Sequence, residues 1–257
     1  MIDVVPGDPA SPVLLHVPHA GTELPGWVRG RLLLDDGELA AEVAALTDHR
    51  TDEIAAGAGG GAWRVVHRLS RFAVDVERFP DGREAMEAVG MGAVYRRGTR
   101  GQRIRDDDPA HREALLDAYF RPWAAAVERL VGERIAATGR AVLVDVHSYP
   151  RDPLPYEQCP GGPRPAFCLG TDPVHTPPDL LAAARDAFRP DVALDSPFAG
   201  AYVPLSRYGT DRRVAAIMIE IRRDGYAADL DDVTARLTAF LADPRTSAAP
   251  RSGPETS

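Results

Sequence analysis

The chain has 257 residues, of which 44% are hydrophobic and 26% charged, a balance that suits one sizeable domain or one domain with an inserted lobe. Its formal net charge of −8 argues against nucleic acid or an anionic membrane as a partner, because phosphate groups bind to a basic face. All 30 basic residues are arginines, which excludes a catalytic lysine and a Schiff base.

Three strands and one helix are predicted in the N-terminal half of the chain. Apolar runs predict strands over 13–17, 63–69 and 72–76, and an apolar stripe predicts a helix over 35–57. Asp48 and Asp52 lie four positions apart in that helix, which would place both carboxylates on one of its faces. The segment 80–106 is rich in Gly, Arg and Asp and lacks periodicity, so we expect a long loop that is functional or mobile.

The C-terminal half alternates helices with strands. The predicted elements are a helix that begins at Pro109 and is kinked or divided at Pro122, strands over 141–147, 166–170 and 214–221, and helices over 178–188 and 228–242. This alternation implies an α/β fold with a mixed, mainly parallel sheet covered by helices on both faces. We expect one domain over residues 1–242 and a disordered tail over 243–257, which has almost nothing apolar.

The sequence shows no targeting or membrane segment. The N-terminus lacks the basic start and apolar core of a signal peptide, and no segment reaches the roughly 18 apolar residues of a membrane span. We therefore expect a cytoplasmic protein without a membrane partner. Cys159 and Cys168 lie in a loop rich in Pro and Gly, where they can pair, although two cysteines without a secretory signal are more often free thiols.

Three predicted strands run directly into ionisable residues. His19 follows the first strand, and His147 and Glu220 end two later strands. Enzymes with an α/β fold deliver side chains in this way to the carboxyl edge of a sheet, where ligands bind. Two imidazoles and one carboxylate with an open fourth position form a catalytic zinc site, in which the bound water is acidified. We therefore expect Zn²⁺ at His19 and His147. His16 alternates with apolar neighbours, and we interpret it as structural.

The third metal ligand and the role of Glu220 have alternatives. Three carboxylates are candidates for the ligand: Asp48, Asp52 and Glu23. The two aspartates also fit a solvated helix face, and Glu23 also fits a loop. Glu220 is either a general base for the metal-activated water, with its pKa raised in a dry cleft, or the salt-bridge partner of Arg222 or Arg223.

Arg78 is the candidate for binding a substrate carboxylate. It follows a predicted strand, and its planar guanidinium can donate two parallel hydrogen bonds to a carboxylate. An ion pair with Glu77 or Asp81 is the alternative. Asp145 lies two positions before His147 on the same face of a strand, where it either orients that ligand or pairs with an arginine.

Five motifs follow one another along the chain. They are Val17-Pro18-His19-Ala20-Gly21, Asp48 with Asp52, Arg71 with Val74-Asp75-Val76-Glu77-Arg78, Asp145-Val146-His147-Ser148, and Ile219-Glu220-Ile221-Arg222. Their order resembles the N-formylglutamate amidohydrolase family, the enzyme class that ends one route of histidine degradation. The resemblance covers the chain roughly from His16 to Tyr226 and implies an enzyme of amino-acid catabolism.

Two of the motifs also look like segments of the zinc carboxypeptidases. Asp145-Val146-His147-Ser148-Tyr149 resembles the segment with the second zinc histidine, and Glu220-Ile221-Arg222 resembles the segment with the catalytic glutamate. This resemblance implies a phosphorylase/hydrolase-like architecture, with helices around a mixed sheet and zinc at its carboxyl edge. It also implies that the substrate carboxylate binds at Glu77-Arg78, where those enzymes have an Asn-Arg pair.

The chain departs from the carboxypeptidase pattern at two positions. The glutamate that follows the first zinc histidine by three positions is Thr22 here, so Asp48 becomes the first choice for the third ligand. Glu77 stands in place of the asparagine, and its negative charge beside Arg78 would weaken the binding of an acidic substrate by like-charge repulsion.

We therefore expect a zinc-dependent amidohydrolase that cleaves a small, acidic N-acyl amino acid such as N-formylglutamate. The residues expected to take part are His19, Asp48 and His147 for the metal, Glu220 for proton transfer, and Arg78, Arg207 and Arg222 for the substrate carboxylate. One alternative is a metal-dependent peptidase or amidase that acts on a peptide or a peptidoglycan-like amide. The other is a catalytically inactive relative that binds a small acid.

Overall fold

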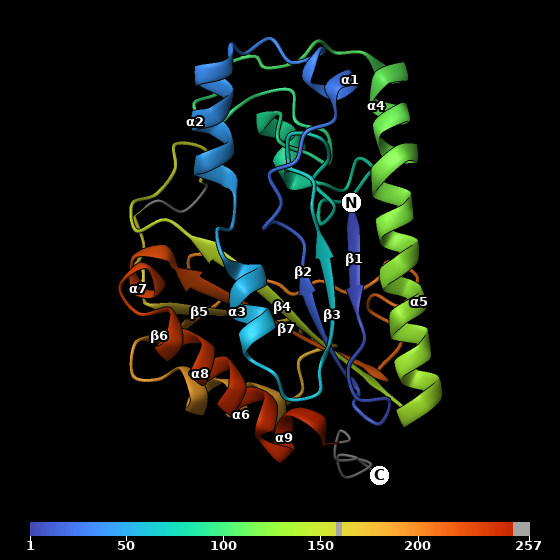
Figure 1. Ribbon diagram of the computed structural model, residues 1–257, viewed down its shortest axis with the longest axis vertical. Helices are drawn as coiled ribbons and strands as arrows, with labels where there is room; N and C mark the ends of the chain where they lie inside the picture. Colours follow the sequence, from blue (N-terminus) through green and yellow to red (C-terminus); the bar gives the residue numbers. More distant parts are fainter. Residues whose placement is uncertain (158–160, 249–257) are drawn as a thin grey trace.

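The computed structural model describes residues 1–157 and 161–248 of the chain. These residues contain one seven-stranded sheet with helices on both sides (Figure 1). The strands are Ile2–Val5 (β1), Val13–Val17 (β2), Trp63–His67 (β3), Ala141–Tyr149 (β4), Phe167–Gly170 (β5), Val192–Leu194 (β6) and Val214–Arg222 (β7). Their order across the sheet is β1-β3-β2-β4-β7-β5-β6.

The sheet is mixed and mostly parallel, which confirms the fold predicted from the alternation of elements. The pairs β2·β3, β2·β4, β4·β7 and β5·β6 are parallel, whereas β1·β3 and β5·β7 are antiparallel. The longest pairing joins β4 to β7 and runs from Ala141↔Val214 to Tyr149↔Arg222. The carboxyl ends of β2, β4 and β7 therefore meet at one edge of the sheet.

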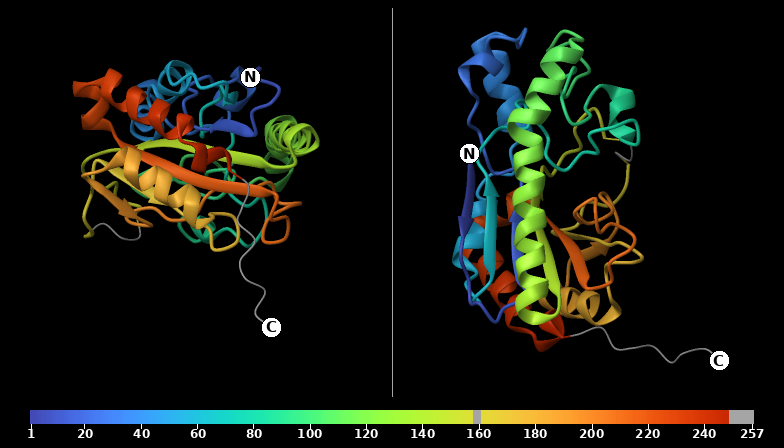
Figure 2. Two further views of the ribbon diagram at one scale, coloured as in Figure 1. Left: turned by 90° about the horizontal axis from the view of Figure 1, so that it is seen from below. Right: turned by 90° about the vertical axis from the view of Figure 1, so that its right-hand side faces the viewer.

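Helices cover both faces of the sheet (Figure 2). The helices are Gly26–Arg29 (α1), Asp36–Leu46 (α2), Thr51–Gly57 (α3), Pro109–Leu115 (α4), Arg121–Thr138 (α5), Pro178–Phe188 (α6), Arg223–Ala228 (α7), Leu230–Ala242 (α8) and Pro244–Ser247 (α9), with a 3₁₀ helix at Ala85–Val89 (η1) and a π-helical turn at Leu116–Phe120 (η2). The helices α3, α6 and α8 pack on one face, and α5 packs on the other. None of the described helices is long and apolar enough to cross a membrane.

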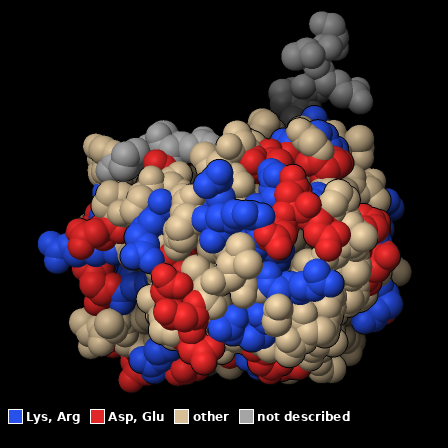
Figure 3. Space-filling model, turned by 90° about the horizontal axis from the view of Figure 1, so that it is seen from above, with Lys and Arg blue, Asp and Glu red and all other residues tan. Residues whose placement is uncertain are grey.

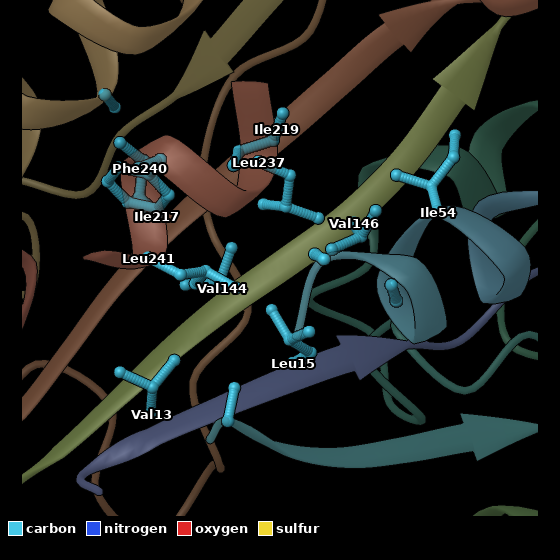
Figure 4. Close-up of a cluster of buried hydrophobic side chains, with 14 of the residues drawn as sticks. Val13, Leu15, Ile54, Val144, Val146, Ile217, Ile219, Leu237, Phe240 and Leu241 are labelled. Atoms are coloured by element: carbon cyan, nitrogen blue, oxygen red, sulfur yellow. The ribbon is translucent and has the colours of Figure 1, made fainter. Parts of the chain in front are cut away.

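Buried aliphatic side chains of the central strands join the sheet to these helices. All nine residues of β4 are buried, as expected for a strand covered on both faces. On one face Val144 and Ile217 belong to the same cluster as Leu237 and Phe240 of α8 (Figure 4). On the other face Trp123 of α5 is fully buried. The two central strands are therefore held from both sides, which fixes where their carboxyl ends lie.

The helix expected over 35–57 is two helices, α2 and α3. In the connection between them Arg50 adopts a left-handed φ of 63°, and the backbone N–H of Asp48 donates to the carbonyl of His19 at 2.9 Å. The prediction that Asp48 and Asp52 share a helix face is therefore wrong. Asp48 lies in the connection and is only 1% exposed, because the break turns it toward the sheet edge.

The strand expected over 72–76 is a turn. The backbone N–H of Ala73 donates to the carbonyl of Ser70 at 2.8 Å, and the N–H of Phe72 donates to the Ser70 hydroxyl at 3.2 Å. These local hydrogen bonds compete with pairing to a neighbouring strand. The long loop predicted over 80–106 is present and contains the short helix η1.

The end of the chain is folded further than expected. Asp243 accepts the backbone N–H of Arg245 at 2.8 Å at the start of α9, and the fully buried Thr246 donates its hydroxyl to the Phe240 carbonyl at 2.6 Å. The low apolar content of this segment predicted disorder, but polar contacts hold its first residues in place. The rest of the expected tail, residues 249–257, lies outside the described residues, as does Cys159, while Cys168 is a buried free thiol.

Candidate active site

The candidate site lies where β2, β4 and β7 end. In the parallel register Asp145 lies opposite His16, and His147 lies opposite Glu220. A cavity of about 850 Å³ lies at this edge, and segments of the loops 78–86 and 197–208 form much of its wall. The ionisable side chains that line the cavity include His19, Asp48, Arg71, Asp75, Glu77, Arg78, Asp145, His147, Glu220 and Arg223.

Charges on the molecular surface are mixed. The sequence has 30 arginines and 38 acidic residues, and the two kinds are interspersed on the face seen from above (Figure 3). Exposed pairs are common, such as Arg29 with Asp36 and Arg96 with Glu87, each at 2.7 Å. Positive and negative charges on the surface therefore offset one another locally. The buried ionisable groups at the sheet edge are not part of this surface pattern.

Three predicted metal ligands converge at this edge. His19 Nδ1 and His147 Nδ1 are 3.3 Å apart, and Asp48 Oδ2 lies 3.8 Å from the first and 3.0 Å from the second. Zinc bonds of about 2.0–2.1 Å in a tetrahedron would separate neighbouring ligand atoms by about 3.3 Å. The three donor atoms are of the kinds that zinc prefers, and their separations fit one ion.

Carboxylates lie beside the other nitrogens of both histidines. His19 Nε2 lies 3.0 Å from Asp75 Oδ1, so this nitrogen carries the proton and Nδ1 presents its lone pair. His147 Nε2 lies 2.9 Å from Asp145 Oδ1. Burial opposes the charged form of His147, but the carboxylates of Asp145 and Glu77 hold its pKa well above the ordinary value. Such an electron-rich environment favours binding of a cation.

Two arginines hold the Asp48 carboxylate. Arg71 Nη2 lies 3.2 Å from both of its oxygens, and Arg223 Nη2 lies 3.4 Å from Oδ1. Burial alone would raise the pKa of Asp48, but Arg71 and the neighbouring histidines hold it well below its usual range. Asp48 is therefore ionised at neutral pH and available as a ligand through Oδ2.

The two reserve candidates for the third ligand lie elsewhere. Asp52 Oδ2 pairs with Arg68 Nη1 at 2.7 Å, and Glu23 forms a backbone bridge with Leu69. Neither side chain lines the cavity. The structure thus leaves Asp48 as the one of the three candidate carboxylates that meets both histidines.

Replacing Asp48 by asparagine is expected to weaken zinc binding by at least about tenfold, because an amide oxygen is neutral while a carboxylate ligand is charged. Asp52→Asn is the matched control, since Asp52 lies four positions away and pairs with Arg68. Competition titration with a chelator measures both affinities. An equal loss in the two variants, or a larger loss for Asp52→Asn, would contradict the assignment.

Glu220 is buried without an ion pair. It is 8% exposed, and among the residues that the structure describes no basic group lies within 4.0 Å of its carboxylate. The predicted salt-bridge alternative does not form, because Arg222 pairs with Asp224 at 2.7 Å and Arg223 contacts Asp48. Burial, which outweighs the effect of His147, raises the pKa of Glu220 to about 8. This value suits a group that exchanges a proton near neutral pH.

Arg78 lines the cavity with a guanidinium that is free to bind a ligand. Its nearest acceptors are Asp75 Oδ2 at 3.5 Å and Glu84 Oε1 at 3.7 Å, and it donates no hydrogen bond to any described residue. The expected alternatives, ion pairs with Glu77 or Asp81, are not formed. The arrangement leaves its planar donors available for a carboxylate.

Arg207 and Arg222 do not line the cavity, contrary to prediction. Arg207 is held by Glu128 and Asp211, each at 2.7 Å. Arg222, beside the loop before β5, pairs with Asp224 and donates to the carbonyl of Arg164. Their guanidinium groups are used by structural acceptors, so we assign neither residue to the substrate.

Several residues of the site had no correct role in the sequence prediction, among them Asp75, which holds His19 Nε2. Arg71 and Arg223 support Asp48, which only the folded chain reveals. His16, expected to be structural, lies with Glu77 and Asp145 in a cluster whose ligand atoms are within 4.8 Å of one another. Glu77 contacts histidines and does not pair with Arg78. The sequence places Glu77 directly before Arg78 in a motif that resembles a strand, but the chain turns at this point.

Comparisons with known proteins agree with this fold. The family model described as N-formylglutamate amidohydrolase matches residues 11–227. The crystal structure of N-formylglutamate amidohydrolase from Ralstonia eutropha JMP134 is similar with a TM-score of 0.79 at 19% identity, over 93% of this chain and 96% of that one. A gene product from Agrobacterium tumefaciens has a TM-score of 0.67 at 22% identity, over 93% and 91% of the two chains. No curated protein matches the chain.

Proposed function

Because the chain belongs to the N-formylglutamate amidohydrolase family, we propose that it is a zinc-dependent amidohydrolase that cleaves a small N-acyl amino acid such as N-formylglutamate. One observation carries this proposal. The ligand atoms of His19, Asp48 and His147 converge in a cavity that also holds the unpaired carboxyl group of Glu220. The site thus combines a metal-binding triad with a candidate general base.

The side chains divide the work of hydrolysis among them. Zinc bound at the triad would polarise the scissile carbonyl and acidify a water molecule. Glu220 accepts a proton from the water that attacks the carbonyl carbon, and donates it to the nitrogen of the leaving amine as the C–N bond breaks. Asp75 orients His19 through a hydrogen bond, Asp145 lies beside His147, and a pKa of Glu220 near 8 lets the carboxyl group act in both directions.

Arg78 binds the carboxylate of the substrate in this proposal. Replacing Arg78 by lysine is expected to raise KM about tenfold to a hundredfold, because the loss of one charge-assisted hydrogen bond costs about 1.5–3 kcal/mol. Steady-state kinetics with N-formylglutamate measures the effect, and analogues with a blocked α-carboxylate should change little.

Arg83→Lys is the matched control for Arg78. Arg83 also lines the cavity, but it is 61% exposed in its side chain and pairs with Asp81 at 2.7 Å. Its replacement should leave KM within about twofold of the wild type, since exposed pairs contribute about 0–1 kcal/mol. Equal effects in the two variants would remove Arg78 from the substrate site.

A second candidate substrate is a peptide or a peptidoglycan-like amide, and the size of the cavity favours it. N-formylglutamate has about 12 non-hydrogen atoms, which would fill about 360 Å³ at the roughly 30 Å³ that each water occupies in the liquid. The cavity of about 850 Å³ is more than twice as large. A hydrolysis screen that spans N-formyl, N-acetyl and N-succinyl amino acids and short peptides tests both candidates. If the zinc-loaded protein hydrolyses none of them but binds the free acids, it is the inactive, acid-binding relative.

A further inference from the structure

The side chain of Glu77 is mostly buried, with 16% of its surface exposed. Among the residues that the structure describes, none donates a hydrogen bond to Oε1 of its carboxylate, which is completely enclosed. Three histidine nitrogens lie within 3.4 Å of the two carboxylate oxygens. Burial of an ionised carboxylate is costly unless it is paired with hydrogen-bond donors or coordinates a metal. Glu77 therefore relies on histidine neighbours, and its Oε1 has no hydrogen-bond donor among the described residues.

The two oxygens of Glu77 face two different groups of ligands. Oε2 lies 3.3 Å from His19 Nδ1, a ligand atom of the proposed zinc triad, and 3.2 Å from His147 Nε2, the ring nitrogen that the triad does not use. Oε1 lies 3.4 Å from His16 Nδ1, on the side where His16 meets Asp145. The ligand atoms of His16, Glu77 and Asp145 all lie within 4.8 Å of one another, and so do those of His19, Glu77 and His147.

Protons alone do not satisfy the carboxylates of this cluster. His16 Nδ1 has at most one proton, and it points at Asp145 Oδ1, 2.8 Å away, which leaves Glu77 Oε1 without a donor. His147 Nε2 lies near Asp145 and Glu77 but has hydrogen-bonding geometry to neither. The buried acceptors outnumber the protons aimed at them, and a cation would satisfy several of them at once.

We propose that Glu77 bridges two divalent metal ions, the zinc of the triad and a second ion bound by His16 and Asp145. The inference rests on the proposed function for the first ion only. One imidazole and two carboxylates form a set of ligands that zinc accepts. Ions that share a bridging ligand in two-metal sites lie about 3.5–4 Å apart, and such a pair can stabilise both the attacking and the leaving group.

A one-metal site is the alternative explanation of the same contacts. In that case His16 donates to Asp145, Asp145 holds His147 in place, and Glu77 completes the coordination of the single ion. The two explanations differ in the number of ions bound and in the effect of removing His16. Both differences can be measured without an activity assay.

Zinc stoichiometry provides the first test. Protein stripped with a chelator is reloaded with zinc alone, desalted and analysed for metal. The wild type should bind two zinc ions per chain, and His16→Phe should bind one, because phenylalanine keeps the ring that stacks on Tyr202 at 4.3 Å but has no ligand atom. His67→Phe is the matched control, since His67 is equally buried and contacts the same Trp123 as His16, yet lies outside the cluster.

Each stoichiometry has a distinct meaning. One zinc in the wild type overturns the two-metal inference and leaves the proposed function intact, whereas no zinc contradicts both. Two zinc ions in His16→Phe, with thermal unfolding like that of the wild type, overturn the assignment of His16. Should His16→Phe fail to fold, Asp145→Asn replaces it, and the weaker of its two zinc affinities should fall at least about tenfold.

The bridge itself has a spectroscopic signature. Two Mn²⁺ ions that share a carboxylate show exchange coupling in electron paramagnetic resonance, whereas separate ions do not. The wild type loaded with Mn²⁺ alone should give the coupled spectrum, and Glu77→Gln should lose it. A spectrum of uncoupled ions in the fully loaded wild type would overturn the role of Glu77 as a bridge.

Discussion

Replacing Glu220 by glutamine is expected to lower kcat about a hundredfold to ten-thousandfold and to leave the zinc content unchanged. Glutamine has nearly the same size and can still fill the site, but its amide cannot accept a proton from water. The buried carboxyl group has no ion pair to a described residue, so its removal breaks no salt bridge and should not unfold the protein. Turnover numbers and metal analysis on the same preparations separate the chemical step from metal binding.

Glu128→Gln is the matched control for this variant. Glu128 also lines the cavity, but its carboxylate is bound by Arg207 at 2.7 Å. Its replacement should change kcat by less than about fivefold, in keeping with the small value of partly exposed ion pairs. A Glu220→Gln enzyme with nearly normal turnover would mean that another group accepts the proton.

The pH dependence of the wild type should show the same group. Glu220 acts as a base only when it is ionised, so kcat/KM should rise with pH and be half-maximal at about pH 8, the pKa that burial gives the carboxyl group. A bound cation favours the carboxylate and would move this limb to lower pH. A half-maximal point well above pH 8 would point to a different base.

Removing either histidine of the triad should abolish hydrolysis. His19→Ala and His147→Ala are each expected to bind at least one zinc ion fewer per chain than the wild type, because each loses one of three ligand atoms that lie 3.0–3.8 Å apart. Both side chains lie at the sheet edge, and neither belongs to a hydrophobic cluster. The thermal unfolding of the metal-free variants should therefore stay close to that of the metal-free wild type.

Metal analysis and hydrolysis assays on these variants give a clear outcome. His67→Phe, which removes a buried histidine outside the site, should keep its zinc and its activity. Full zinc content in either triad variant would show that the ligand was assigned wrongly. Loss of zinc with full hydrolysis would contradict metal-dependent catalysis altogether.

The parts of the site carried by long, buried strands could be predicted from the sequence. His147 and Glu220 end apolar runs that had to be central strands, and parallel strands bring their carboxyl ends together. The pairing of these two residues in register then follows from the fold. The cavity lies at the carboxyl edge of the sheet, where these strand ends meet.

Residues carried by turns were predicted less well. The break that turns Asp48 inward depends on the left-handed conformation of Arg50, a residue type that does not signal such a conformation. Glu77 was read as the end of a strand, but the local hydrogen bonds of Ser70 turn the chain and bring its carboxylate to the histidines. Side-chain hydrogen bonds of this kind have no periodic signature in the sequence.

The substrate arginines show a different limit. Arg207 and Arg222 belong to a chain with 30 arginines and 38 acidic residues that can pair with them. Long side chains reach acceptors that are distant along the chain, as Arg207 reaches Glu128. Sequence spacing therefore could not distinguish an arginine that is free to bind substrate, such as Arg78, from one that is already occupied.

The cavity draws its chemistry and its shape from different parts of the fold. His147 and Glu220 belong to strands locked in register, whereas much of the wall comes from the loops 78–86 and 197–208. Insertions, deletions and substitutions in those loops can reshape the space for an acyl group or a side chain while the reacting groups keep their spacing. Directed evolution toward new amides should therefore succeed most often when diversity is confined to the loops and excluded from β4 and β7.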